Sequence, residues 1–144
     1  MKMTTLIVPA LISILGAYRT AVAQPSEKVL DAIQRVESGG SKDPANQIGD
    51  NKKALGWMQL HRPYVQDAKE YDKSLGKYTY EEICRSRELS RKATVAYLTR
   101  YAGKDATPKQ YSFCHNSGSG WRKKTGRALE NLNKYWAKIQ KHLK

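Results

Sequence analysis

Two carboxyl side chains in the first third of the sequence, Glu37 and Asp50, stand in opposite local surroundings. Glu37 ends a run of apolar residues at helical spacing, directly before Ser38 and two glycines. The partial negative charge of a helix C-terminus and apolar neighbours both raise the pKa of a carboxyl group, as a proton donor requires. Asp50 lies in a polar stretch before Lys52 and Lys53, whose charges favour its ionised form. One protonated and one ionised carboxyl group are the usual catalysts of glycosidic-bond cleavage.

Several residues that could bind a sugar follow these two carboxyl groups in the sequence. Gln59 can donate and accept hydrogen bonds to sugar hydroxyls, and the rings of Trp57 and Tyr64 could stack on a sugar face. His115 and Asn116 come directly before a glycine-rich segment, where polar side chains stay accessible. The two aromatic residues and the histidine also have a simpler interpretation, which is packing in the core. No histidine pairs with a serine in a recognisable nucleophile motif, which disfavours a serine hydrolase.

The two cysteines, Cys84 and Cys114, lie thirty residues apart and leave two possibilities open. In an oxidising compartment they could form a disulfide, which would close a long loop and stabilise the fold by about 3 kcal/mol. The alternative is a pair of buried free thiols. Neither cysteine has another cysteine or clustered histidines at metal-ligand spacing, so we expect no metal site and no cofactor.

The elements that must position these residues are expected to be mostly helical. Residues 26–37 have helical spacing, with Ser26 as the cap, whereas the turn-forming residues of 41–60 predict a small β-hairpin or an ordered loop. Further helices are expected from Pro63 to 71, over 80–85, over 88–101, from Pro108 to 115 and over 129–143. Tyr71 and Leu129 belong to the apolar sets that we expect in the core. The sequence thus predicts a single, mainly α domain (α+β, with about five to seven helices) whose β-hairpin lies next to the active-site cleft.

Residues 1–23 have the features of a cleaved signal peptide. A positive start precedes twelve mostly apolar residues, Leu6–Ala17, and the small-x-small motif Ala21-Val22-Ala23 follows. As a helix this run would be only about 18 Å long, too short for a bilayer, so we expect no stable membrane anchor. The alternatives are an uncleaved anchor or a buried helix. We expect a secreted, extracellular chain (or one in a lysosome or digestive vacuole) with a catalytic domain over 24–144.

The charge of the chain predicts an anionic partner. The sequence carries a formal charge of +13, and because residues 1–23 hold two cations and no acid, residues 24–144 carry +11. Nucleic-acid binding would require that the chain stay in the cytosol or the nucleus. For a secreted chain we therefore expect no nucleic acid, but bacterial peptidoglycan and anionic cell walls, bound by a monomer.

Taken together, these residues resemble the invertebrate-type (destabilase-like) lysozymes. The similar stretches occur in the same order over nearly the whole of residues 24–144. They are Val36-Glu37-Ser38-Gly39, Gly49-Asp50, Gly56-x-x-Gln59, Pro63-Tyr64, Ala96-Tyr97-Leu98-x-Arg100-Tyr101, His115-Asn116-x-Gly118 and Tyr135-Trp136-x-Lys138. The chain departs from the family in having only two cysteines, and in Trp57 and Val65, which change the expected shape of the cleft.

The resemblance implies a lysozyme-like fold and a muramidase activity. Such an enzyme hydrolyses the β-1,4 bond between N-acetylmuramic acid and N-acetylglucosamine in peptidoglycan, for antibacterial defence or for digestion. The resemblance implies Glu37 as the general acid and Asp50 as the second carboxylate, with Gln59, Tyr64, His115 and Asn116 along the sugar cleft. Two alternatives stay open on the same fold. One is a non-catalytic, cationic wall-binding or antimicrobial protein, and the other is a lytic transglycosylase, which needs one acid and no second carboxylate.

Overall fold

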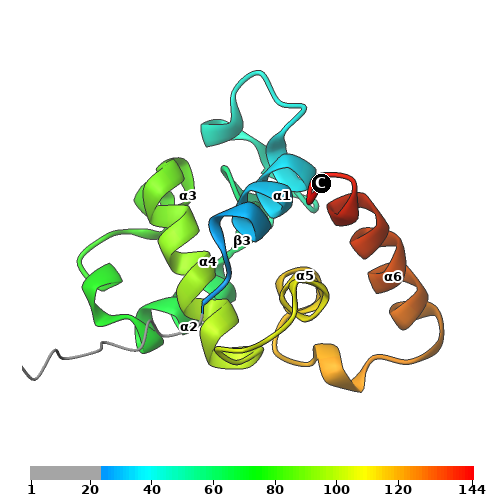
Figure 1. The fold of residues 1–144 in the computed structure, drawn as a ribbon. Helices are drawn as coiled ribbons and strands as arrows, with labels where there is room; N and C mark the ends of the chain where they lie inside the picture. Colours follow the sequence, from blue (N-terminus) through cyan, green and yellow to red (C-terminus); the bar gives the residue numbers. More distant parts are fainter. Residues whose placement is uncertain (1–23) are drawn as a thin grey trace, which may run out of the picture.

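Helices dominate the structure, a computed structural model that describes residues 24–144 (Figure 1). The α-helices of this part are α1 (Glu27–Ser38), α2 (Arg62–Tyr71), α3 (Tyr80–Arg85), α4 (Arg87–Tyr101), α5 (Pro108–Ser117) and α6 (Gly126–Gln140). They agree with the predicted segments to within a few residues. The predicted signal peptide, residues 1–23, lies outside the described residues. Between residues 24 and 144, no helix combines the length and the apolar character that crossing a bilayer requires.

A small antiparallel sheet lies between α1 and α2. Its strands are β1 (Ile48–Gly49), β2 (Ala54–Leu55) and β3 (Leu60–His61), in the order β1-β2-β3. The predicted hairpin is therefore present, and a third strand extends it, since the turn at Gln59 (φ 48°) returns the chain alongside β2. Short 3-10 helices complete the described chain: η1 (Pro44–Asn46) before the sheet, η2 (Lys73–Leu75) after α2 and η3 (Trp121–Lys123) after α5.

Local sequence signals fix where several helices begin. The Ser26 hydroxyl accepts a hydrogen bond from the backbone N–H of Val29, as predicted for the cap of α1. Two further helices begin with reciprocal capping boxes, formed by Thr79 with Glu82 at α3 and by Thr107 with Gln110 at α5. These caps satisfy N–H groups that a helix leaves unpaired in its first turn, so the chain itself determines these boundaries.

A single hydrophobic cluster holds the helices together, with α4 at its centre. Helices α2 and α3 pack on α4, and α5 packs on α6. The predicted core positions are mostly buried, but Tyr71 is 46 % exposed and Leu129 is 39 % exposed. Both lie at the edge of an apolar helix face that is wider than the surface its neighbours cover. Leu143, predicted within the last helix, lies beyond the end of α6.

Of the two possibilities that the sequence leaves open for the cysteines, the structure has the second, because Cys84 and Cys114 are buried free thiols and not the possible disulfide. Cys84 belongs to α3, where its carbonyl oxygen lies against Gly56, and Cys114 belongs to α5. Burial raises the pKa of each thiol to about 12, so neither is a thiolate near neutral pH. The two cysteines therefore serve the fold as small apolar side chains.

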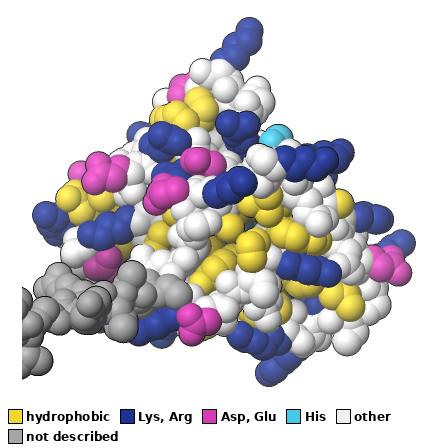
Figure 2. Space-filling view, in the orientation of Figure 1, with side chains coloured by type: hydrophobic (Ala, Val, Ile, Leu, Met, Phe, Trp, Pro, Cys, Tyr) yellow, Lys and Arg dark blue, Asp and Glu magenta, His cyan; other side chains and the backbone are white. Residues whose placement is uncertain are grey.

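The positive charge is spread over the surface of the described part. On the face shown in Figure 2, Lys and Arg side chains are scattered across most of the outline instead of gathering in one stripe. Acidic side chains are fewer, and apolar side chains lie between them. A distributed charge of this kind attracts a large polyanion to many parts of the molecule, so a specific site has to come from a cleft.

Candidate active site

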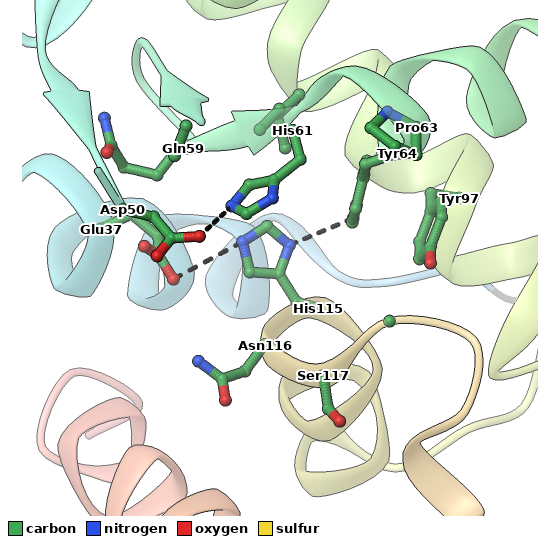
Figure 3. A pocket seen from close by; sticks show the side chains of 13 residues that line it. Glu37, Asp50, Gln59, His61, Pro63, Tyr64, Tyr97, His115, Asn116 and Ser117 are labelled. Atoms are coloured by element: carbon green, nitrogen blue, oxygen red, sulfur yellow. Dashed lines mark hydrogen bonds and ion pairs between the residues drawn. The ribbon is translucent and has the colours of Figure 1, made fainter. Parts of the chain in front are cut away.

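A cleft of about 600 Å³ opens between the sheet and the ends of α1, α2 and α5 (Figure 3). Six of the seven residues that the sequence singles out for catalysis or binding line it. They are Glu37, Asp50, Gln59, Tyr64, His115 and Asn116. The remaining lining residues are Ala54, Leu60, His61, Pro63, Tyr97, Ser117 and Gly118. Residues from six helices and strands, and from the turns beside them, therefore meet in one hollow.

Trp57, the seventh predicted residue, does not line this cleft. Its indole N–H donates to the carbonyl of Arg85 over 3.0 Å, and its own carbonyl accepts from the Ser38 hydroxyl over 2.7 Å. The ring packs against the core. The predicted stacking on a sugar is thus replaced by a structural position, which ties the sheet region to α1 and to the end of α3.

The Glu37 carboxyl group is mostly enclosed, with 19 % of its side chain exposed. Burial raises its pKa from 4.5 to about 7, against the lowering effects of a hydrogen bond from Tyr135 and of the Lys138 charge. The Tyr135 hydroxyl donates to Oε1 over 2.6 Å, and burial holds the pKa of this hydroxyl far above its usual value. The rise predicted from the sequence is present, and its first cause is the enclosure of the carboxyl group.

His115 lies beside Glu37 without forming an ion pair near neutrality. Its Nε2 atom is 3.6 Å from Oε1 of Glu37, which fits the geometry of an ion pair. Burial, however, lowers the pKa of His115 to about 4, so the imidazole is neutral wherever Glu37 begins to ionise. The other ring nitrogen, Nδ1, is 3.1 Å from the Tyr64 hydroxyl. A neutral ring leaves the high pKa of Glu37 in place, whereas a cation there would lower it.

Tyr64 and Tyr97 support this histidine from behind. Their rings stack with centroids 3.6 Å apart and planes inclined by 14°. Tyr64 is 8 % exposed and Tyr97 is 4 % exposed, so both rings form the floor of the cleft and present little surface to a ligand. Tyr64 can therefore offer only a small surface to a sugar. Its main contact in the site is with His115, which it helps to position.

Asp50 lies at the exposed tip of the turn between β1 and β2. Its side chain is 57 % exposed, and Oδ2 is 3.2 Å from Nε2 of His61 (Figure 3). The backbone of Asp50, Asn51 and Lys52 has φ of 45°, 51° and 69°, a conformation that Asp and Asn tolerate better than most residues. The expected lysine partners form no ion pair with Asp50 within the described chain, where its partner is His61.

A set of amide hydrogen bonds fastens this turn to the end of α1. The Gln47 amide donates to the Glu37 carbonyl over 3.0 Å, and the Gln59 amide donates to the carbonyls of Gln47 and Gly56 over 3.1 and 2.9 Å. A Cβ atom at Gly49 would overlap Oε1 of Gln59. Gln59 therefore uses both amide protons on the backbone, so that it positions the two carboxyl groups relative to each other and has only its oxygen left for a sugar.

For three residues of the site, Tyr135, His61 and Tyr97, the sequence assigned no part, although Tyr97 and Tyr135 fall in stretches on which the family resemblance rests. Tyr135 is 98 residues from Glu37, and His61 and Tyr97 occur in segments that read as ordinary strand and helix. Their contacts arise because α6, β3 and α4 converge on the cleft. Among residues 24–144, no group of three or more His, Cys, Asp and Glu side chains is arranged to hold a metal ion.

In chemical terms the cleft holds two carboxyl groups with different tasks. Glu37 has a pKa of about 7 and retains a proton near neutrality, while Asp50 faces solvent beside an imidazole. Such a pair can protonate a leaving oxygen on one side and stabilise a developing cation on the other.

Two solved structures have folds similar to that of the described chain. The described chain is similar to the crystal structure of Tapes japonica lysozyme, with a TM-score of 0.64 and 24 % identity over 81 % of this chain and 89 % of that chain. It is similar also to a chain in the crystal structure of Aeromonas hydrophila PliI in complex with Meretrix lusoria lysozyme, with a TM-score of 0.64 and 21 % identity over 81 % and 88 %. No protein-family model and no curated protein matches the sequence. The chain has a lysozyme-like α+β fold, as the resemblance implied.

Proposed function

Proceeding from a lysozyme-like fold, we propose that this chain is a secreted muramidase that hydrolyses the β-1,4 bond between N-acetylmuramic acid and N-acetylglucosamine in bacterial peptidoglycan. The observation that carries the proposal is the meeting of Glu37 and Asp50 in one cleft, the first enclosed with a pKa of about 7 and the second exposed. The pattern of residues 1–23 supports secretion, and the charge of +11 on residues 24–144 (13 − 2) supports an anionic wall as the partner.

Glu37 is the proton donor of the proposed reaction. With a pKa of about 7 it is half protonated near neutrality, which suits a group that must give a proton to the glycosidic oxygen and later take one back. The Tyr135 hydroxyl fixes the orientation of Oε1, and the neutral His115 ring bounds the other side. The leaving sugar departs with the proton of Glu37, and the bond between its oxygen and the anomeric carbon breaks.

Asp50 supplies the negative charge that the oxocarbenium-like transition state needs. Its exposed position lets a sugar ring approach the carboxylate directly, and the contact with His61 limits the directions in which the side chain can point. A water molecule then completes the hydrolysis, with its proton passing to Glu37 and its oxygen forming the new reducing end.

The proposal is tested by separating cleavage from wall binding. In a suspension of Gram-positive cells, Glu37→Gln should slow the loss of turbidity by at least about 10²-fold, because it removes the proton donor. Sedimentation with isolated walls should show unchanged binding, since the charge of the surface is nearly the same. If the variant lyses cells as fast as the parent protein, the glycosidase assignment is wrong and a cationic wall-binding protein is the better description.

A second measurement distinguishes hydrolysis from lytic transglycosylation. Mass analysis of the fragments released by the parent protein should show new reducing ends and no anhydro ring. Asp50→Asn should lower the cleavage rate by roughly 10²- to 10³-fold, since it removes charge from the transition state. Anhydro products together with a nearly unaffected Asp50→Asn variant would identify a transglycosylase instead.

A further inference from the structure

A second pocket of about 500 Å³ adjoins the cleft beside β2 and β3. Three residues line both hollows: Ala54, His61 and Pro63. Ala54 and His61 are cross-strand partners, so one pair of side chains separates the two spaces. A ligand that fills the cleft can therefore continue past this pair without leaving the surface of the protein.

Basic side chains surround this pocket, which we call the basic pocket and define by Lys52, Lys53, Arg62 and Arg85. Arg62 is already engaged, since it pairs with Glu81 over 2.6 Å and lies 4.2 Å from the centre of the Tyr80 ring. Among the ion pairs of residues 24–144, none involves Lys52, Lys53 or Arg85. Three cations are thus left to face the pocket with a single carboxylate, that of Glu81, on its wall.

Apolar side chains complete the lining. Ile48 is 63 % exposed, the largest exposure among the large hydrophobic residues of the described chain, and Leu55 and Tyr80 lie beside it. A pure polyphosphate would gain nothing from such a surface. A peptide that carries both carboxylates and aliphatic carbons would contact the cations and the apolar patch together.

We propose that the basic pocket binds the acidic stem peptide that peptidoglycan carries on the lactyl group of N-acetylmuramic acid. This inference rests on the proposed muramidase function, which places the muramic acid in the adjoining cleft. The stem is covalently attached to the sugar, so it must lie within reach of the cleft whenever the glycan is bound. Its carboxylates and its alanine side chains match the two kinds of surface that the pocket offers.

The turn between β1 and β2 explains how one segment serves both spaces. Asp50 lines the cleft, while Lys52 and Lys53, two and three residues later, line the basic pocket. The two lysines therefore act on the substrate instead of on Asp50. The cleft would bind the sugar chain, and the basic pocket would strengthen the binding of glycan whose stem peptides are intact.

The test compares two substrates and two triple variants. The substrates are purified peptidoglycan with intact stems and the same glycan after an amidase has removed the stems. The pocket variant is Lys52→Gln/Lys53→Gln/Arg85→Gln. Its matched control is Arg127→Gln/Lys134→Gln/Lys141→Gln, which removes three exposed charges from α6 and its C-cap. The pocket variant should lower kcat/KM about tenfold on the intact substrate, mainly through KM, and change it less than about twofold on the stripped glycan. The control should affect both substrates alike.

A binding measurement tests whether the basic pocket binds the stem peptide, even if the protein cleaves no glycan. In the Glu37→Gln background, calorimetry should show tighter binding of a disaccharide with a tetrapeptide stem than of the same disaccharide without it. The pocket substitutions should abolish this difference, and the α6 control should preserve it. A glycerol phosphate polymer, which the distributed positive charge attracts, should weaken the binding of both disaccharides to the same extent and leave the difference between them unchanged.

The outcomes separate the two proposals. If the parent protein cleaves neither substrate but the stem still strengthens binding through Lys52, Lys53 and Arg85, the muramidase assignment fails and the pocket stands. If the stem changes neither kcat/KM nor affinity, or if the phosphate polymer abolishes the difference between the two disaccharides, the assignment of the basic pocket is overturned whatever the cleavage result.

Discussion

The two sides of the cleft each carry one carboxyl group, but they enclose it to different degrees. We call the end of α1 with α5 and α6 the helical wall, and residues 48–61 the hairpin wall. On the helical wall Glu37 is enclosed among Tyr135 and His115, and its pKa rises to about 7. On the hairpin wall Asp50 is 57 % exposed at the tip of a turn. A division of labour between two carboxyl groups thus arises from how deeply each wall encloses its own group.

The comparison also separates two kinds of rigidity. The helical wall is held by packed side chains on three helices, so its polar groups are positioned by the core. The hairpin wall has strands of only two residues and depends on the hydrogen bonds of Gln47 and Gln59 and on the glycine at position 56. Damage to the hairpin wall should therefore displace Asp50, while changes in the helical wall should act through the protonation of Glu37.

Of the substitutions that test the difference between the two walls, Gly56→Ala in the hairpin wall should have the largest effect. Gly56 has φ 80°, and a Cβ atom there would overlap the carbonyl oxygen of Cys84. The substitution should lower the free energy of unfolding by at least about 3 kcal/mol, measured by urea denaturation. Gly40→Ala is the matched control, because a Cβ atom at Gly40 meets nothing within 4 Å. Equal stability of the two variants would show that the hairpin wall does not depend on this close approach.

Next in size is the effect of Glu37→Gln on stability as a function of pH. The folded chain holds the Glu37 proton more tightly than an unfolded chain, with a pKa of about 7 against 4.5, so ionisation costs stability as the pH rises through this range. The variant should be similar to the parent near pH 4 and more stable by up to about 3 kcal/mol near pH 8. Urea denaturation across this range measures the difference. A difference of the same size for the exposed Glu130→Gln would contradict burial as its source.

Tyr135→Phe tests how the helical wall controls the pKa of Glu37. The Tyr135 hydroxyl donates to Glu37 and lowers the pKa of that carboxyl group, so its removal should raise this pKa further. The alkaline limb of the pH–rate profile should then move up by about one pH unit. Tyr111→Phe, which removes a buried hydroxyl bonded to Gly103 and Lys104, should leave the profile where it is. A shift toward lower pH would reverse the assigned direction.

The smallest effect is expected from His61→Gln on the hairpin wall. The pair of His61 and Asp50 is about half exposed on both sides, and solvent screens such pairs strongly. The free energy of unfolding should change by less than about 0.5 kcal/mol, while the cleavage rate falls a few-fold because Asp50 is less well oriented. Loss of activity as large as that of Asp50→Asn would mean that His61 takes a direct part in the reaction.

Much of the fold follows from local signals that the sequence carries. The Ser26 cap, the prolines that open α2 and α5 and the helical spacing of apolar residues locate the helices, while Gly49 and Gly56 mark the turns of the sheet. The two carboxyl groups were recognisable from their local positions. Glu37 stands at a helix C-terminus, where cations are favoured, and Asp50 stands in a turn, where Asp is common. Trp57 was placed wrongly in the cleft, since nothing local reveals that its indole N–H is used by the backbone. Gln59 does line the cleft, but its hydrogen bonds to two backbone carbonyls could not be read from the sequence.

By itself, the sequence determined to within a few residues where the helices lie, which residue types could perform acid–base chemistry, and the excess of positive charge. Each of these depends on interactions between residues near in the chain, or on composition alone. The tertiary structure alone decided that Tyr135, His115 and His61 would lie beside the two carboxyl groups, and that Cys84 and Cys114 would be buried separately. The physical reason is that desolvation and charge act through space, so a pKa depends on which distant segments enclose a group.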